Sequence, residues 1–67
     1  MAIAEPKPHS LWKHTNGNHY EVMFSANIHS SNPDYPPTVV YFNTHNKLKY
    51  TKPSARWYKV MTLLEKQ

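Results

Sequence analysis

Residues 11–27, with the sequence LWKHTNGNHYEVMFSAN, contain the clearest structural signal in this chain. The only glycine of the protein, Gly17, lies near the centre of this segment between two asparagines. Segments that alternate apolar and polar residues flank it on both sides, a pattern typical of a β-hairpin. The sequence therefore predicts two antiparallel strands, over residues 11–15 and 19–27.

The register of this hairpin depends on the length of its loop. A two-residue turn at 16–17 places Trp12 opposite Glu21. A three-residue loop at 16–18 places it opposite Val22 instead. We expect the longer loop, because it turns the large ring of Trp12 toward the apolar face of the second strand. The residues of that face are Tyr20, Val22, Phe24 and Ala26.

The size of the chain limits what can stabilise it. It has 67 residues and no cysteine, so it can form neither disulfides nor thiolate zinc sites. A domain of this length buries only about 60% of its unfolded surface. Two tryptophans, five tyrosines and two phenylalanines must therefore supply most of the core, and oligomerisation is a further source of stability.

The remaining chain divides into a tail, a loop and more strands. Residues 1–9 contain two prolines and predict a flexible tail before a single domain over residues 10–67. Three prolines make 28–37 a turn-rich loop. Residues 38–42 are all β-branched or aromatic, which favours a strand inside the sheet.

A further hairpin and a helical pattern complete the chain. Residues 47–52 alternate, so we expect Leu48 and Tyr50 to face inward. Ser54 is a suitable N-cap for a short helix over 54–60. Residues 60–64 fit a helix or a closing strand. These elements predict a mainly β fold: a small, partly open antiparallel barrel of four or five strands with one short helical segment near the C-terminus.

Several short motifs add a family resemblance. They are Trp12-x-His14, Gly17-Asn18-x-Tyr20-x-Val22, Val39-Val40-Tyr41 and Tyr50-x-Lys52-Pro53-x-x-x-Trp57. Their order and spacing resemble a family of short SH3-like β proteins from bacteria and phages, for which no function is established. The chain departs from the family pattern at Lys52, where an arginine is usual, and in the second hairpin, which lacks a glycine. The resemblance implies an SH3-like barrel in a bacterial or phage accessory protein and implies no catalytic residue.

Composition argues against several function classes. The four acidic residues are far apart in the sequence, and neither a nucleophile motif nor a glycine-rich phosphate loop is present. We therefore expect a protein that is not an enzyme and that uses no cofactor. No apolar run reaches the length of a membrane span and no secretory signal is recognisable, so we expect no membrane partner and a cytoplasmic location, in the host cytoplasm if a phage encodes the protein.

The five histidines raise the question of a metal site. In the shorter hairpin register, His14 and His19 would lie opposite each other and share a metal with a third ligand such as Glu21. No His-x-x-x-His or comparable spacing is present, so we expect no metal site. We expect instead that the ring of His14 packs on Tyr20 and forms a hydrogen bond with a backbone group.

Two surfaces are candidates for binding a partner. The proline-rich loop presents Tyr35, Pro36 and Pro37 as a stiff aromatic surface of the kind that docks proteins. Small barrels bind single-stranded nucleic acid by combining a cationic groove with stacking aromatic residues, and the net charge of +4 favours an anionic partner. The candidates for this use lie in a basic segment interleaved with aromatic residues and are Lys47, Lys49, Lys52, Arg56, Tyr58 and Lys59. The interleaving argues partly against this use, because alternation directs Tyr50 and Lys49 to opposite faces. We expect an interaction module, monomeric or a small homo-oligomer, that binds a partner protein, with nucleic-acid binding as the alternative.

Overall fold

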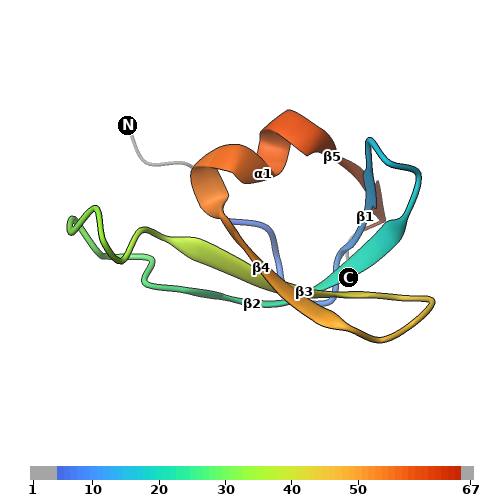
Figure 1. The fold of residues 1–67 in the computed structure, drawn as a ribbon, viewed down its shortest axis with the longest axis horizontal. Coiled ribbons are helices and arrows are strands. Elements are labelled where there is room, and N and C mark those ends of the chain that lie inside the picture. The colour runs from blue at the N-terminus through green and yellow to red at the C-terminus, as the bar shows by residue number, and fades with distance from the viewer. Residues whose placement is uncertain (1–4, 66–67) are drawn as a thin grey trace.

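The computed structural model describes residues 5–65, which form one curved antiparallel sheet and a short helix (Figure 1). The elements are β1 (Leu11–His14), β2 (His19–Ala26), β3 (Thr38–Asn43), β4 (Lys49–Pro53), α1 (Ser54–Val60) and β5 (Met61–Glu65). The strand order is β4-β3-β2-β1-β5. The two outer strands, β4 and β5, do not pair with each other in this part of the chain. The predicted fold class is confirmed, because the sheet is unclosed and has the form of a small, partly open barrel.

The core lies between α1 and the side of the sheet that curves around it (Figure 1). Trp57 of α1 has 0% exposed surface. Its ring meets the rings of Trp12 and Tyr41 edge-on, at centroid distances of 5.5 and 4.9 Å. The ring of Tyr20 continues this cluster, 5.2 Å from Tyr41. The buried apolar residues are Trp12, Tyr20, Val22, Val39, Tyr41, Trp57 and Met61.

The first hairpin is present, but its register differs from both alternatives. Trp12 pairs with Tyr20, so the loop comprises residues 15–17. The glycine takes the last loop position, where φ is +93° and the Gly17 N–H donates to the carbonyl of His14 at 2.9 Å. In a three-residue hairpin loop, the residue with a positive φ is the last one. The expected loop 16–18 would have placed Gly17 at its centre. The register is shifted by two residues from the expected one, so Trp12 still faces the core.

A β-bulge changes the direction of side chains along β2. Val22 pairs with Tyr41 and Phe24 pairs with Val40, so Met23 is an extra residue without a partner of its own. Beyond Met23, each side chain of β2 therefore points to the side of the sheet opposite to the one that simple alternation predicts. Phe24, which the sequence predicted to face the core, points to the opposite side of the sheet and is 50% exposed.

The second hairpin corrects another prediction. Strand β4 begins at Lys49, two residues later than expected, because Lys47 has a φ of +66° and belongs to the turn. Leu48 therefore lies outside the strand and is exposed, although we expected it to face inward. Tyr50 does face inward, where its ring lies 6.1 Å from that of Tyr20. Strand β3 has neighbours on both sides, as its sequence predicted.

Helix α1 spans the predicted residues, but Ser54 is not its N-cap. Pro53 holds that position, and Ser54 is the first helical residue. Buried Ser54 instead donates its N–H to the carbonyl of Pro37 at 2.9 Å and its hydroxyl to the carboxylate of Glu5 at 2.6 Å. Residues 61–65 form β5, so the strand was the right alternative. Within residues 5–65, no helix is long and apolar enough to cross a membrane.

The described part of the predicted tail lies against the domain. Pro6 is buried. The His9 N–H donates to the carbonyl of Val22 at 2.8 Å, and the Val22 N–H donates to the carbonyl of Ser10 at 3.0 Å. Residues 9 and 10, which directly precede β1, thus extend its pairing with β2. The chain before them, from residue 5, comes from the side of the domain where α1 begins. Residues 1–4 of the predicted tail lie outside the described residues.

We predict that Trp57→Ala lowers the free energy of unfolding by about 3–5 kcal/mol, because the substitution leaves a cavity where three aromatic rings meet. A domain of this length has a total stability of roughly 3–10 kcal/mol, so the variant should be largely or wholly unfolded. Urea unfolding followed by circular dichroism measures the change. Tyr35→Ala, which removes an exposed ring, is the control and should cost less than about 0.5 kcal/mol. A loss below about 1 kcal/mol for Trp57→Ala would contradict the central position of this ring.

Candidate functional site

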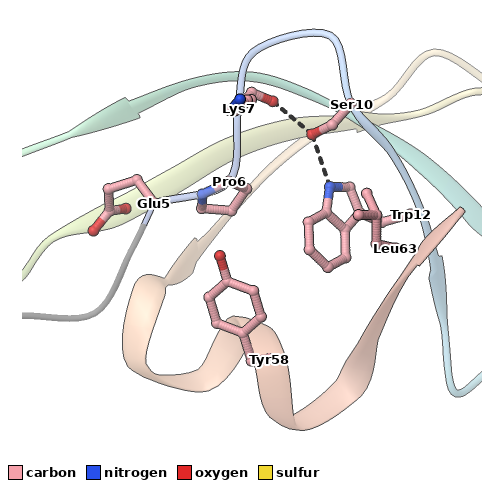
Figure 2. A pocket seen from close by; sticks show the side chains of 7 residues that line it. All are labelled: Glu5, Pro6, Lys7, Ser10, Trp12, Tyr58 and Leu63. Carbon is pink, nitrogen blue, oxygen red and sulfur yellow. Dashed lines mark hydrogen bonds between the residues drawn. The ribbon is translucent and has the colours of Figure 1, made fainter. Parts of the chain in front are cut away.

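An apolar cleft opens between α1, β1, β5 and segment 5–10 (Figure 2). We call it the aromatic cleft, and its lining residues are Glu5, Pro6, Lys7, Ser10, Trp12, Tyr58 and Leu63. Its volume is about 200 Å³. Because an apolar cavity of about 150 Å³ holds a benzene molecule, the aromatic cleft has room for a group the size of one apolar side chain.

Hydrogen bonds and ring contacts fix the tryptophan wall of this cleft. The indole N–H of Trp12 donates to the hydroxyl oxygen of Ser10 at 2.8 Å, and that hydroxyl donates to the carbonyl of Lys7 (Figure 2). On its other sides, the ring of Trp12 meets the rings of Trp57 and Tyr58 edge-on, at 5.5 and 5.6 Å. These contacts hold the Trp12 ring in place.

Tyr58 forms the adjoining wall, in edge-on contact with the ring of Trp12. It follows Trp57 in α1, so the residue that anchors the helix in the core also sets the direction of Tyr58. Its hydroxyl points toward the side of the cleft formed by Pro6 (Figure 2). Partial burial raises the pKa of Tyr58 above the ordinary value of 10.0, and the negative charge of Glu5 raises it further. The cleft thus combines an apolar interior with a carboxylate at its edge.

The proline-rich loop is the second part of the candidate site. Tyr35 is 63% exposed, so its ring is directed into solvent and not onto the core. Its N–H donates to the carbonyl of Asn32 at 3.0 Å, and the hydroxyl of Thr38 donates to the carbonyl of Pro36 at 2.7 Å. The Asn32 side chain also accepts the N–H of Asp34 at 2.9 Å. These bonds hold the loop that carries the exposed tyrosine.

Ser54 connects the loop to the aromatic cleft. Its backbone N–H binds the carbonyl of Pro37 at the end of the loop, and its hydroxyl binds Glu5 at the edge of the cleft. The loop and the cleft therefore meet at the first turn of α1. Sequence reasoning identified Tyr35, Pro36 and Pro37 as candidates but gave no sign of this connection, because it depends on residues far apart in the chain.

The basic candidates are not gathered on one surface. Lys49 pairs with Phe42 and Lys52 pairs with Val39 across β3 and β4. Since neighbouring register positions alternate between faces, Lys52 lies on the face of buried Val39 and Lys49 lies on the opposite face. The two lysines therefore cannot contact the same flat surface.

The helical and turn candidates are also separated. Arg56 and Tyr58 are two residues apart in α1, which places them about 160° apart around the helix axis. Lys59, like Arg56, is exposed on the helix. Lys47 lies in the turn before β4, with its Nζ 5.7 Å from the centre of the Phe42 ring. The structure thus distributes these residues over several sides of the domain.

His14 has the two contacts that we expected. Its ring lies edge-on to that of Tyr20 at 6.1 Å, and its Nδ1 accepts the N–H of Asn16 at 2.9 Å. Another imidazole, that of His9, has its Nδ1 3.5 Å from the carboxylate of Glu21. Among the residues that the structure describes, no group of three or more histidine or acidic side chains is placed to hold a metal ion.

Comparison with known proteins found no matching family model, and no curated protein or solved structure with significant similarity to the chain. The resemblance to SH3-like proteins therefore stays a prediction. What the site can do is inferred from its own geometry: a stiff exposed aromatic loop next to a preformed apolar cleft.

We predict that Glu5→Gln lowers the pKa of Tyr58 but leaves it above the ordinary value of 10.0, because burial is the larger cause of the shift. An NMR titration of the Tyr58 ring measures this, with Glu21→Gln as the control that should change nothing. Because the unfolded chain ionises first, Tyr58 should lose its contribution to stability as the pH rises above about 10. A pKa of Tyr58 that does not respond to Glu5→Gln would contradict the placement of Glu5 beside it.

Proposed function

We propose that this protein is a small, non-catalytic interaction module that binds a partner protein through the Tyr35 loop and the aromatic cleft. The observation that carries the proposal is the 63% exposure of the Tyr35 ring on a hydrogen-bonded loop that joins the cleft at Ser54. Exposed tyrosine and tryptophan are enriched where proteins bind each other. The polar groups of the cleft have structural partners: the hydroxyl of Ser10 binds the carbonyl of Lys7 and the indole N–H of Trp12, and the carboxylate of Glu5 accepts the hydroxyl of Ser54.

The amount of exposed apolar surface supports the same function. Among the described residues, eight large hydrophobic side chains are exposed, one more than the seven apolar residues of the buried core. A contiguous exposed apolar patch commonly marks a contact with another molecule, and two of these residues, Tyr58 and Leu63, line the aromatic cleft together. Tyr35 and Tyr58 belong to this exposed set and lie in the two parts of the candidate site.

The rigidity of the site is the third support. Binding costs free energy when side chains and loops must become ordered, so a surface that is already held binds more tightly for the same area. Trp12 is held by Ser10 and by two neighbouring rings, and the loop is held by Asn32. A partner side chain that enters the aromatic cleft would act as the anchor, with Tyr35 as a second contact.

The SH3-like assignment belongs to this proposal. It is supported by the motifs between Trp12 and Trp57 and by a small, partly open antiparallel sheet, which is the kind of fold that the resemblance implies. On the same resemblance, we propose that the protein is a cytoplasmic accessory protein of a bacterium or phage. Nucleic-acid binding has less support, because Lys49 and Lys52 lie on opposite faces.

We predict that Tyr35→Ala weakens binding to the partner by about 30-fold or more, the effect of losing an aromatic anchor from an interface. The partner is first identified by cross-linking from cells that express the protein at its native level, and the affinity is then measured with purified proteins. His29→Ala, an exposed residue of the same loop, is the matched control and should change the affinity by no more than about twofold.

Two results would contradict the proposal. One is equal affinity of the purified partner for the wild-type protein and Tyr35→Ala. The other is recovery of nucleic acid in place of a protein, with oligonucleotide binding whose salt dependence has a log-log slope of about −0.7 for each neutralised phosphate of a single strand.

A further inference from the structure

The sheet has an apolar face on the side turned away from α1. Tyr41 faces the helix, where its ring meets that of Trp57, so its neighbours Val40 and Phe42 point to the opposite side. Beyond the bulge, Phe24 joins them as the partner of Val40. We call Phe24, Val40 and Phe42 the outer stripe. In Figure 1, α1 lies on one side of β2, β3 and β4, and no described segment covers their other side.

Opposite charges flank this stripe. Phe42 pairs with Glu21 on β2 and with Lys49 on β4, so the three side chains form one row across the sheet. The register places Glu21 on one side of Phe42 and Lys49 on the other, and the ammonium of Lys47 lies 5.7 Å from the centre of the Phe42 ring. The next row contains Phe24, Val40 and Thr51. The outer face therefore has an apolar stripe with a glutamate on the β2 side and lysines on the β4 side.

We propose that the outer face binds a second copy of this chain, face to face, across a two-fold axis that runs parallel to β3. Rotation about that axis lays β2 of one copy over β4 of the other and β3 over its own counterpart. Phe42 and Val40 then meet the same residues of the second copy. Glu21 of each copy lies opposite Lys49 of the other, so the arrangement forms two ion pairs.

Packing also favours a second copy as the occupant. A sheet with apolar residues on both faces is stable when both faces are covered, and face-to-face packing of two sheets is a common way to do this. A chain of 67 residues without disulfides has a small core, so burial of the outer stripe adds stability that the monomer lacks. This inference does not depend on the proposed function, which uses Tyr35 and the aromatic cleft.

Charge reversal tests the arrangement. Sedimentation velocity from about 1 μM to 1 mM should show a monomer–dimer equilibrium for the wild-type protein. Glu21→Lys and Lys49→Glu should each raise the dissociation constant about tenfold or more, because each variant creates two like-charge contacts in its own dimer. An equimolar mixture of the two variants should associate again as a heterodimer, because both contacts then join opposite charges. High salt should weaken both dimers.

Two further variants complete the test. Lys59→Glu makes the same charge change on α1 and should leave the equilibrium unchanged. Thr51→Glu places a charge opposite Phe24 of the second copy and should prevent association, while circular dichroism shows that every variant keeps its fold. The proposal is overturned if the wild-type protein stays monomeric throughout this range. It is also overturned if the single charge reversals associate like the wild type, or if their mixture does not associate.

Discussion

The contact of the Trp57 ring with the rings of Trp12 and Tyr41 is the interaction on which the structure depends. It joins α1 to the two strands that lie next to the edges of the sheet. These are β1, the neighbour of β5, and β3, the neighbour of β4. Because the chain has no cysteine and few large aliphatic residues in its core, aromatic rings supply most of the buried area. The indole N–H of Trp57 is buried without a hydrogen-bond partner within the described residues, a cost that this burial must offset.

The same cluster determines where the candidate site lies. Trp12 contributes one side of its ring to the core and another to the aromatic cleft, and Tyr58 is directed by the neighbouring Trp57. The cleft is thus an exposed extension of the core. Ser54 then links the first turn of α1 to the proline-rich loop and to Glu5. Stability and the proposed recognition consequently share residues on the helical side of the sheet, whereas Tyr35 and the outer stripe can change without disturbing the ring cluster.

Local patterns predicted the elements and the nature of the core better than they predicted individual directions. The mainly β fold, the short helix, the internal position of β3 and the contacts of His14 all follow from residue type and spacing. The inward direction of Phe24 was wrong, because a bulge at Met23 leaves no mark in an alternating sequence. The aromatic cleft was not foreseen, since Pro6 and Ser10 were assigned to the tail or its boundary and their contacts with distant elements have no local signal. The exposure of Tyr35 was expected from the two prolines that follow it, and its role as a partner contact stays a proposal.

Hydrogen exchange at the indole N–H groups tests the central claim most directly. If the Trp57 ring is enclosed by the aromatic cluster, its indole proton should exchange with solvent only when the whole domain unfolds, and its protection should match that of the slowest amides of β2 and β3. The proton of Trp12 should exchange more readily, because local opening of segment 5–10 breaks its bond to Ser10 without unfolding the domain. An indole proton of Trp57 that exchanges as fast as in an unfolded peptide, while the strands remain protected, would contradict this account.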